Sequence, residues 1–130
     1  MKLKYLPMLS LFFLLPLAVN ADAIEKVANL LKQGNAHEIA TLFAGNIDMS
    51  VLEESDVYSK AQAEMILDKF LKENKPKSVK LLHRVSSNPN YNYGVVLLVT
   101  DKGKFRVSYT LKEVNKVMVV IELRIETEKT

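Results

Sequence analysis

The strongest helical pattern in this chain is Tyr58-Ser-Lys-Ala-Gln-Ala-Glu-Met-Ile-Leu-Asp-Lys-Phe-Leu-Lys-Glu-Asn74. Ser59, followed three residues later by Gln62, has the form of a capping box, in which each side chain bonds to the backbone N–H of the other residue. The apolar residues that follow recur at helical spacing and predict one stripe: Ala63, Ile66, Leu67, Phe70 and Leu71. Pro76 ends the pattern, because a residue before proline leaves the α region. A helix with one apolar stripe must pack on a sheet or on other helices.

Two shorter helices are predicted before this one. Asp22 with Glu25, and Asn35 with Glu38, repeat the capping pattern, and a glycine follows each apolar segment. The first segment carries Ile24, Val27, Ala28 and Leu31, and the second carries Ala36, Ile39, Ala40 and Phe43. Two such short helices bury little surface on their own and need further partners.

The remaining patterns predict strands. Alternating or continuous apolar runs lie at residues 46–52, 57–58, 78–86, 93–100, 105–112 and 117–126. Short turns between the last four runs predict an antiparallel meander. The element order is therefore α-α-β-β-α-β-β-β-β, an α+β fold with three helices packed on one face of a curved antiparallel sheet.

The N-terminal residues Met1–Ala21 are expected to be a cleaved signal peptide. Lys2 and Lys4 precede an apolar segment of twelve residues at 6–17, which is shorter than the roughly 20 residues that span a bilayer. Cleavage after Ala21 or after Ala23 suits signal peptidase equally well. The prediction is an exported protein, periplasmic or secreted, with one domain at 22–126, a frayed tail at 127–130 and no membrane span after cleavage.

The amino-acid composition excludes several kinds of partner and site. The chain carries 18 Lys and Arg against 15 Asp and Glu, and loss of Lys2 and Lys4 with the signal peptide leaves 16 − 15 = +1, so no nucleic-acid partner is expected. The absence of cysteine excludes disulfides and cysteine metal sites. The two histidines have no chelating spacing and no glycine-rich phosphate loop is present, so neither a metal nor a cofactor is expected.

The element order and several short stretches of sequence resemble known proteins. The element order resembles the nuclear-transport-factor-2-like (cystatin-like) fold, a cone in which the sheet wraps the long third helix. The amino-acid sequence is similar to that of a bacterial exported family, domain of unknown function 4783, in four stretches: Tyr58–Leu67, Pro76–His83, Gly103–Val107 and Glu122–Glu126. This resemblance implies the fold and an exported location. It implies no activity, because that family has no assigned function and no catalytic motif.

Three residues are candidates for a pocket inside such a cone. His83 shares strand parity with Val79, Leu81 and Val85, which predicts that its imidazole points inward. Tyr109 is expected to line the interior, where its hydroxyl needs a partner. Asp48 lies on the strand face opposite the apolar residues, where an aspartate is ordinarily exposed to solvent. The alternative to a pocket is a histidine satisfied by a backbone carbonyl.

Two functions remain open at this point. The first is a non-catalytic exported accessory domain that binds a small hydrophobic ligand or a protein. The second is a ketosteroid-isomerase-like acid–base enzyme that uses His83 and Tyr109, with Asp48 as a third group. A homodimer through the outer sheet face is also predicted, with the apolar residues Leu82, Val96, Leu98, Val120 and Met118 in the outer registers.

Overall fold

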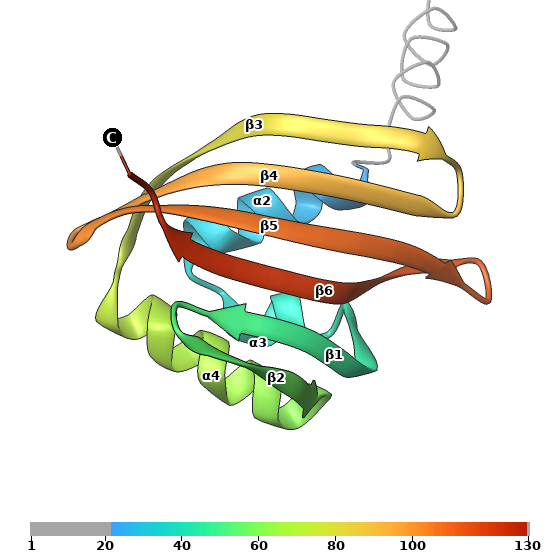
Figure 1. The fold of residues 1–130 in the computed structure, drawn as a ribbon, viewed down its shortest axis with the longest axis horizontal. Helices are drawn as coiled ribbons and strands as arrows, with labels where there is room; N and C mark the ends of the chain where they lie inside the picture. Colours follow the sequence, from blue (N-terminus) through green and yellow to red (C-terminus); the bar gives the residue numbers. More distant parts are fainter. Residues whose placement is uncertain (1–21, 130) are drawn as a thin grey trace, which may run out of the picture.

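The computed structural model describes residues 22–129, so the predicted signal peptide lies outside it. Its helices are α2 (Ala23–Gln33), α3 (Ala36–Ala40) and α4 (Lys60–Glu73). Its strands are β1 (Phe43–Val51), β2 (Glu54–Ser59), β3 (Pro76–Asn88), β4 (Tyr91–Thr100), β5 (Gly103–Val114) and β6 (Val117–Thr127). This is the predicted α+β order (Figure 1). None of these helices is both long enough and apolar enough to cross a bilayer.

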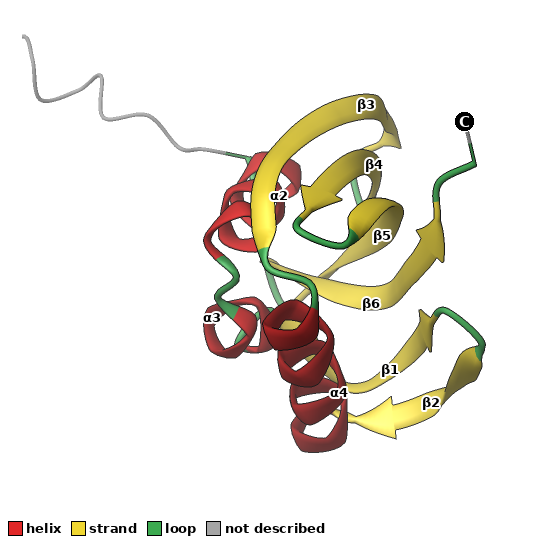
Figure 2. Ribbon diagram, turned by 90° about the vertical axis from the view of Figure 1, so that its left-hand side faces the viewer, coloured by secondary structure: helices red, strands yellow, loops and turns green. Residues whose placement is uncertain are grey.

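One sheet contains all six strands in the order β2-β1-β6-β5-β4-β3. The predicted meander of β3 to β6 is confirmed, with each neighbour antiparallel. The strands β1 and β6 pair in parallel. This differs from the fully antiparallel sheet predicted from the sequence. All three helices lie on the same side of the curved sheet (Figure 2).

The three helices begin at the predicted caps, but the second ends sooner than predicted: α3 stops at Ala40, and Phe43 and Gly45 lie in β1. The Ser59 hydroxyl accepts from the Gln62 N–H at 3.2 Å, and Gln62 Oε1 accepts from the Ser59 N–H at 3.1 Å. At the start of α2, the Asp22 carboxylate accepts from the Glu25 N–H at 2.9 Å. These bonds satisfy N–H groups that the first turn of a helix leaves without a partner. Local sequence therefore fixes where α2 and α4 begin.

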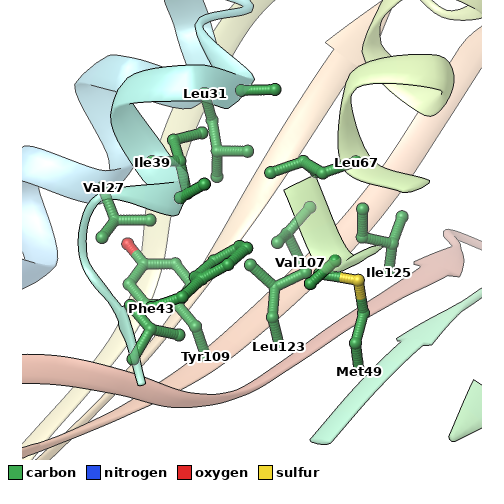
Figure 3. Close-up of a cluster of buried hydrophobic side chains, with 14 of the residues drawn as sticks. Val27, Leu31, Ile39, Phe43, Met49, Leu67, Val107, Tyr109, Leu123 and Ile125 are labelled. Atoms are coloured by element: carbon green, nitrogen blue, oxygen red, sulfur yellow. The ribbon is translucent and has the colours of Figure 1, made fainter. Parts of the chain in front are cut away.

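Aliphatic and aromatic side chains from the helices and from the inner sheet face fill the interior (Figure 3). Leu67 of α4 and Tyr109 of β5 are completely buried, and the rings of Phe70 and Phe105 meet edge to face at 5.0 Å. Interiors packed in this way leave few voids larger than a water molecule. The space wrapped by the sheet is a hydrophobic core.

A bulge in β3 reverses the side-chain faces of that strand. Leu81 pairs with Val96 and His83 pairs with Val95, so Leu82 is an extra residue without a partner on β4. Because side chains alternate along a strand, one extra residue exchanges inside and outside beyond it. The prediction that His83 faces the interior is wrong for this reason, and the imidazole is exposed on the outer face.

A second bulge, in β6, has the same effect. Thr110 pairs with Glu122 and Leu111 pairs with Val120, which leaves Ile121 as the extra residue. Val120 is completely buried in the core, whereas Ile121 is only partly buried. The prediction from simple alternation that Val120 and Met118 face outward is therefore wrong, since both pack in or against the core.

The outer sheet face therefore differs from the predicted one. Val96 and Leu98 of β4 are fully buried under the helices. The outer registers of β4 hold Tyr93, Val95, Leu97 and Val99 instead. A strand that is apolar on both faces gives no sequence signal for which face is inner.

The C-terminal residues are tied to the sheet further than predicted. Thr127 is the last residue of β6, and the Glu128 N–H donates to the Lys104 carbonyl at 3.0 Å. The Glu128 carboxylate also pairs with Arg106, with a Nε–Oε1 distance of 3.0 Å. Two residues of the expected frayed tail, Thr127 and Glu128, thus have partners.

Candidate functional site

Tyr109 is part of the core and lines no open pocket. Its ring is completely buried, and its hydroxyl donates to the Ile24 carbonyl of α2 at 2.7 Å. Burial raises the pKa of the Tyr109 phenol well above its ordinary value, since the charged form loses its hydration. A phenol held neutral and bonded to backbone acts as a link between α2 and the sheet.

The other two predicted residues lie on the opposite face from Tyr109. Asp48 on β1 and His83 on β3 are both exposed there. The strands β6, β5 and β4 separate them, which at about 4.8 Å per spacing puts them roughly 19 Å apart. The structure does not bring His83, Tyr109 and Asp48 together into one site. Within residues 22–129, no three His, Cys, Asp or Glu side chains form a metal-binding group.

A groove lies instead where α4 ends beside the turn between β1 and β2. We call it the hairpin groove; its volume is about 1130 Å³. Its walls are the β1–β2 turn, the second half of α4 and the end of β6. The lining residues are Val51, Leu52, Glu53, Glu54, Met65, Ile66, Lys69, Phe70, Glu73, Asn74, Glu126, Thr127 and Lys129.

Apolar side chains line this groove at two levels. Phe70 and Val51 are buried beneath it. Above them, Met65 on α4 is 71% exposed and Leu52 in the turn is 46% exposed. Large apolar side chains at such exposure lose the stabilisation of burial, and where they gather around a concavity they mark an interaction site.

The backbone holds Leu52 in an uncommon conformation. Its φ is 57°, in the left-handed region, which costs a residue with a Cβ about 1–2 kcal/mol. Its N–H donates to the Ile125 carbonyl of β6 at 2.8 Å, which anchors the turn to the sheet. An exposed leucine kept in a costly conformation suggests a role other than folding.

The rim of the groove is charged. Four carboxylates surround it, those of Glu53, Glu54, Glu73 and Glu126, together with the ammonium groups of two lysines. None of the four carboxylates lies within ion-pair distance of a cationic group in the part of the chain that the structure describes. The rim carries 2 − 4 = −2 charges.

The hairpin groove is not among the sites predicted from the sequence. Residues 53–56 lie between the strands predicted at 46–52 and 57–58, and Met65 falls outside the apolar stripe predicted for α4. One signal was present, since Met65 is a large apolar residue on the solvated side of an amphipathic helix. The neighbourhood of Met65 and Leu52 has no local signature, because it depends on how α4 packs against β1.

The architecture is that of a nuclear-transport-factor-2-like, or cystatin-like, domain with a packed interior. Residues 24–126 match the family described as "Domain of unknown function (DUF4783)", and the chain belongs to that family. The predicted resemblance is thereby confirmed. No curated protein matches the chain.

Solved structures share the fold. A DUF4783 family protein from Bacteroides uniformis is 23% identical, with a TM-score of 0.78 over 84% of this chain and 100% of that chain. A DUF4783 family protein from Bacteroides ovatus is 21% identical, with a TM-score of 0.76 over 85% of this chain and 97% of that chain. A domain of unknown function with a cystatin-like fold from Nostoc punctiforme is 10% identical, with a TM-score of 0.64 over 85% and 81%. At these identities the likeness shows the fold alone.

Proposed function

We propose that this chain is an exported, non-catalytic binding domain and that the hairpin groove holds its ligand. One observation carries the proposal: the interior is packed, whereas Leu52 and Met65 stay exposed over the groove. Binding sites are typically concave, with an apolar lining and a few polar groups that orient the ligand. The hairpin groove has this composition.

Export rests on the N-terminal sequence. Two lysines followed by a short apolar segment and small residues are typical of a secretory signal peptide. The domain at residues 22–129 has one core of its own, so it can operate after the leader is removed.

The acid–base enzyme has less support. Tyr109 is bonded to backbone inside the core, and His83 is exposed on the other side of the sheet. A general acid or base must come within hydrogen-bond reach of the reacting atom, directly or through one water. These two side chains share no pocket in which one substrate can meet both.

Nile red, a neutral dye whose fluorescence rises in apolar surroundings, tests the groove. We expect saturable binding to residues 22–130 and at least tenfold weaker binding to the double variant Leu52→Asn/Met65→Gln. Asparagine tolerates the left-handed conformation, so the turn is retained. Thermal melting checks that the variant is folded.

The matched control is Val114→Gln/Val117→Gln. These valines are 44% and 58% exposed at the end of the β5–β6 hairpin and do not line the groove. We expect the control to bind the dye like the unaltered domain. Equal loss in both double variants means that the dye reads general surface apolarity, and the proposal then fails.

A further inference from the structure

We infer that the hairpin groove takes a basic, amphipathic peptide segment of a partner protein. This inference rests on the proposed function of the groove and adds the chemical class of its ligand. Three features of the groove point to such a segment: its charge, its apolar lining and the free strand beside it.

The negative charge of the groove rim is a local feature and is not shared by the domain as a whole. Residues 22–130 carry a net charge of 16 − 15 = +1, whereas the groove rim carries −2. Glu53 and Glu54 come from the β1–β2 turn, Glu126 from β6 and Glu73 from the last turn of α4. Clustered charge of one sign around a low-dielectric wall attracts ligands of the opposite sign and repels anions.

The end of α4 adds to this field. Glu73 is the last residue of the helix and Asn74 is its cap, and both line the groove. The C-terminal end of a helix carries partial negative charge on its free carbonyl groups, and cations are favoured there. Part of that end is already occupied, since Lys102 donates to the Glu73 carbonyl at 3.2 Å and the Asn74 side chain donates to the Phe70 carbonyl at 3.0 Å. The observed contact with Lys102 shows that this helix end accepts a cation.

Because the groove has an apolar lining, its ligand needs apolar groups as well as positive charge. Leu52 and Met65 offer flexible aliphatic contact above the buried Phe70. Methionine adapts well to side chains of varied shape. A ligand that covers these residues and meets the carboxylates on the rim must present apolar and cationic groups close together.

The strand at the edge of the groove favours a peptide over a small molecule. The volume of about 1130 Å³ lies near the upper end of the range for small-ligand pockets, so the free strand edge is what favours a peptide. β2 begins at Glu54 in the groove and is an edge strand of the sheet. An edge strand leaves one row of backbone N–H and C=O groups open for pairing with an extended segment.

Two fluorescein-labelled peptides of eight residues test the inference by fluorescence anisotropy, one alternating leucine with lysine and one alternating leucine with glutamate. We expect the lysine peptide to bind residues 22–130 at least tenfold more tightly. We expect the double variant Glu53→Gln/Glu54→Gln to lose most of that preference while thermal melting shows that it remains folded.

The control is Glu38→Gln/Glu113→Gln, which removes the same charge from exposed positions away from the groove. Equal affinity for both peptides, or an equal loss in the two double variants, overturns the inference. If Nile red still depends on Leu52 and Met65 in that case, the groove binds small apolar ligands and the proposed function stands. If neither dye nor peptide binds, both proposals fail.

Discussion

Gly94 shows how a single missing side chain brings a helix close to the sheet. It is the one glycine that caps and turns do not explain from sequence. In the structure a Cβ at this position would lie 2.8 Å from Ile24 Cγ2 and 3.4 Å from the Tyr109 ring. Ile24 is almost completely buried and belongs to α2. The glycine therefore allows α2 to approach β4 and lets Tyr109 reach the Ile24 carbonyl.

We predict that Gly94→Ala destabilises the domain by about 1–3 kcal/mol, because β-branched side chains are stiff and a packed core resists extra volume. Chemical denaturation of residues 22–130 measures the change. Gly45→Ala is the matched control, since nothing lies within 4 Å of a Cβ there, and we expect its stability to be equal or slightly higher. A Gly94→Ala domain as stable as the Gly45→Ala domain contradicts the close approach.

At the scale of elements, an exposed side-chain pair links two of the helices. α3 is a helix of only five residues, so its own hydrogen bonds hold it weakly. His37 on α3 meets Glu64 on α4, with Nδ1 and Oε2 3.0 Å apart. The hydrogen bond from the ring to the Glu64 carboxylate, together with its charge, raises the pKa of His37 above its ordinary value of 6.5.

This link predicts a pH dependence. Because the pKa of His37 is higher in the folded state, the contribution to stability is complete below about 6.5, the unfolded value, and is lost as pH rises through the folded value. NMR titration of the imidazole measures this. Glu64→Gln is expected to lower the pKa of His37, whereas Asp68→Asn, one turn further along α4 and paired with Lys72, is expected to change it much less. An unaltered His37 titration in Glu64→Gln contradicts the link.

At the scale of the whole molecule, the helices cover one face of the sheet and leave the other open. The open face carries an apolar row along β4, formed by the exposed Tyr93 and the partly buried Leu97 and Val99, with Val95 buried between them. Arg106 on β5 borders it and Arg124 lies one strand further away on β6, each paired with a glutamate of its own chain. Because these arginines are already paired, a second copy of the chain can pack against the apolar row without leaving their charges unpaired. Small domains gain stability from such contact.

We therefore expect a homodimer through the outer sheet face. Sedimentation equilibrium of residues 22–130 at tens of micromolar is expected to give twice the monomer mass of ~12 kDa, with the equilibrium set by concentration. Leu97→Glu is expected to return the protein to the monomer. Ala61→Glu adds the same charge on the exposed side of α4 and is expected to remain a dimer. A single species of ~12 kDa at these concentrations excludes this assembly.

Interactions between residues close in the chain account for much of this protein. Capping bonds span three residues, apolar stripes repeat every three or four, and short turns join neighbouring strands, so the helices, the meander and the α+β order follow from local patterns. The family resemblance also rests on such short stretches.

Tertiary packing decided the rest. The bulges at Leu82 and Ile121 arise from pairing between strands, and they place His83 outside and Val120 inside. Which face of β4 is buried depends on where α2 and α4 lie against the sheet. The hairpin groove joins Leu52, Met65 and Glu126, residues from three separate segments. No local pattern encodes such neighbourhoods, because their free energy comes from contacts that exist only once distant segments have packed together.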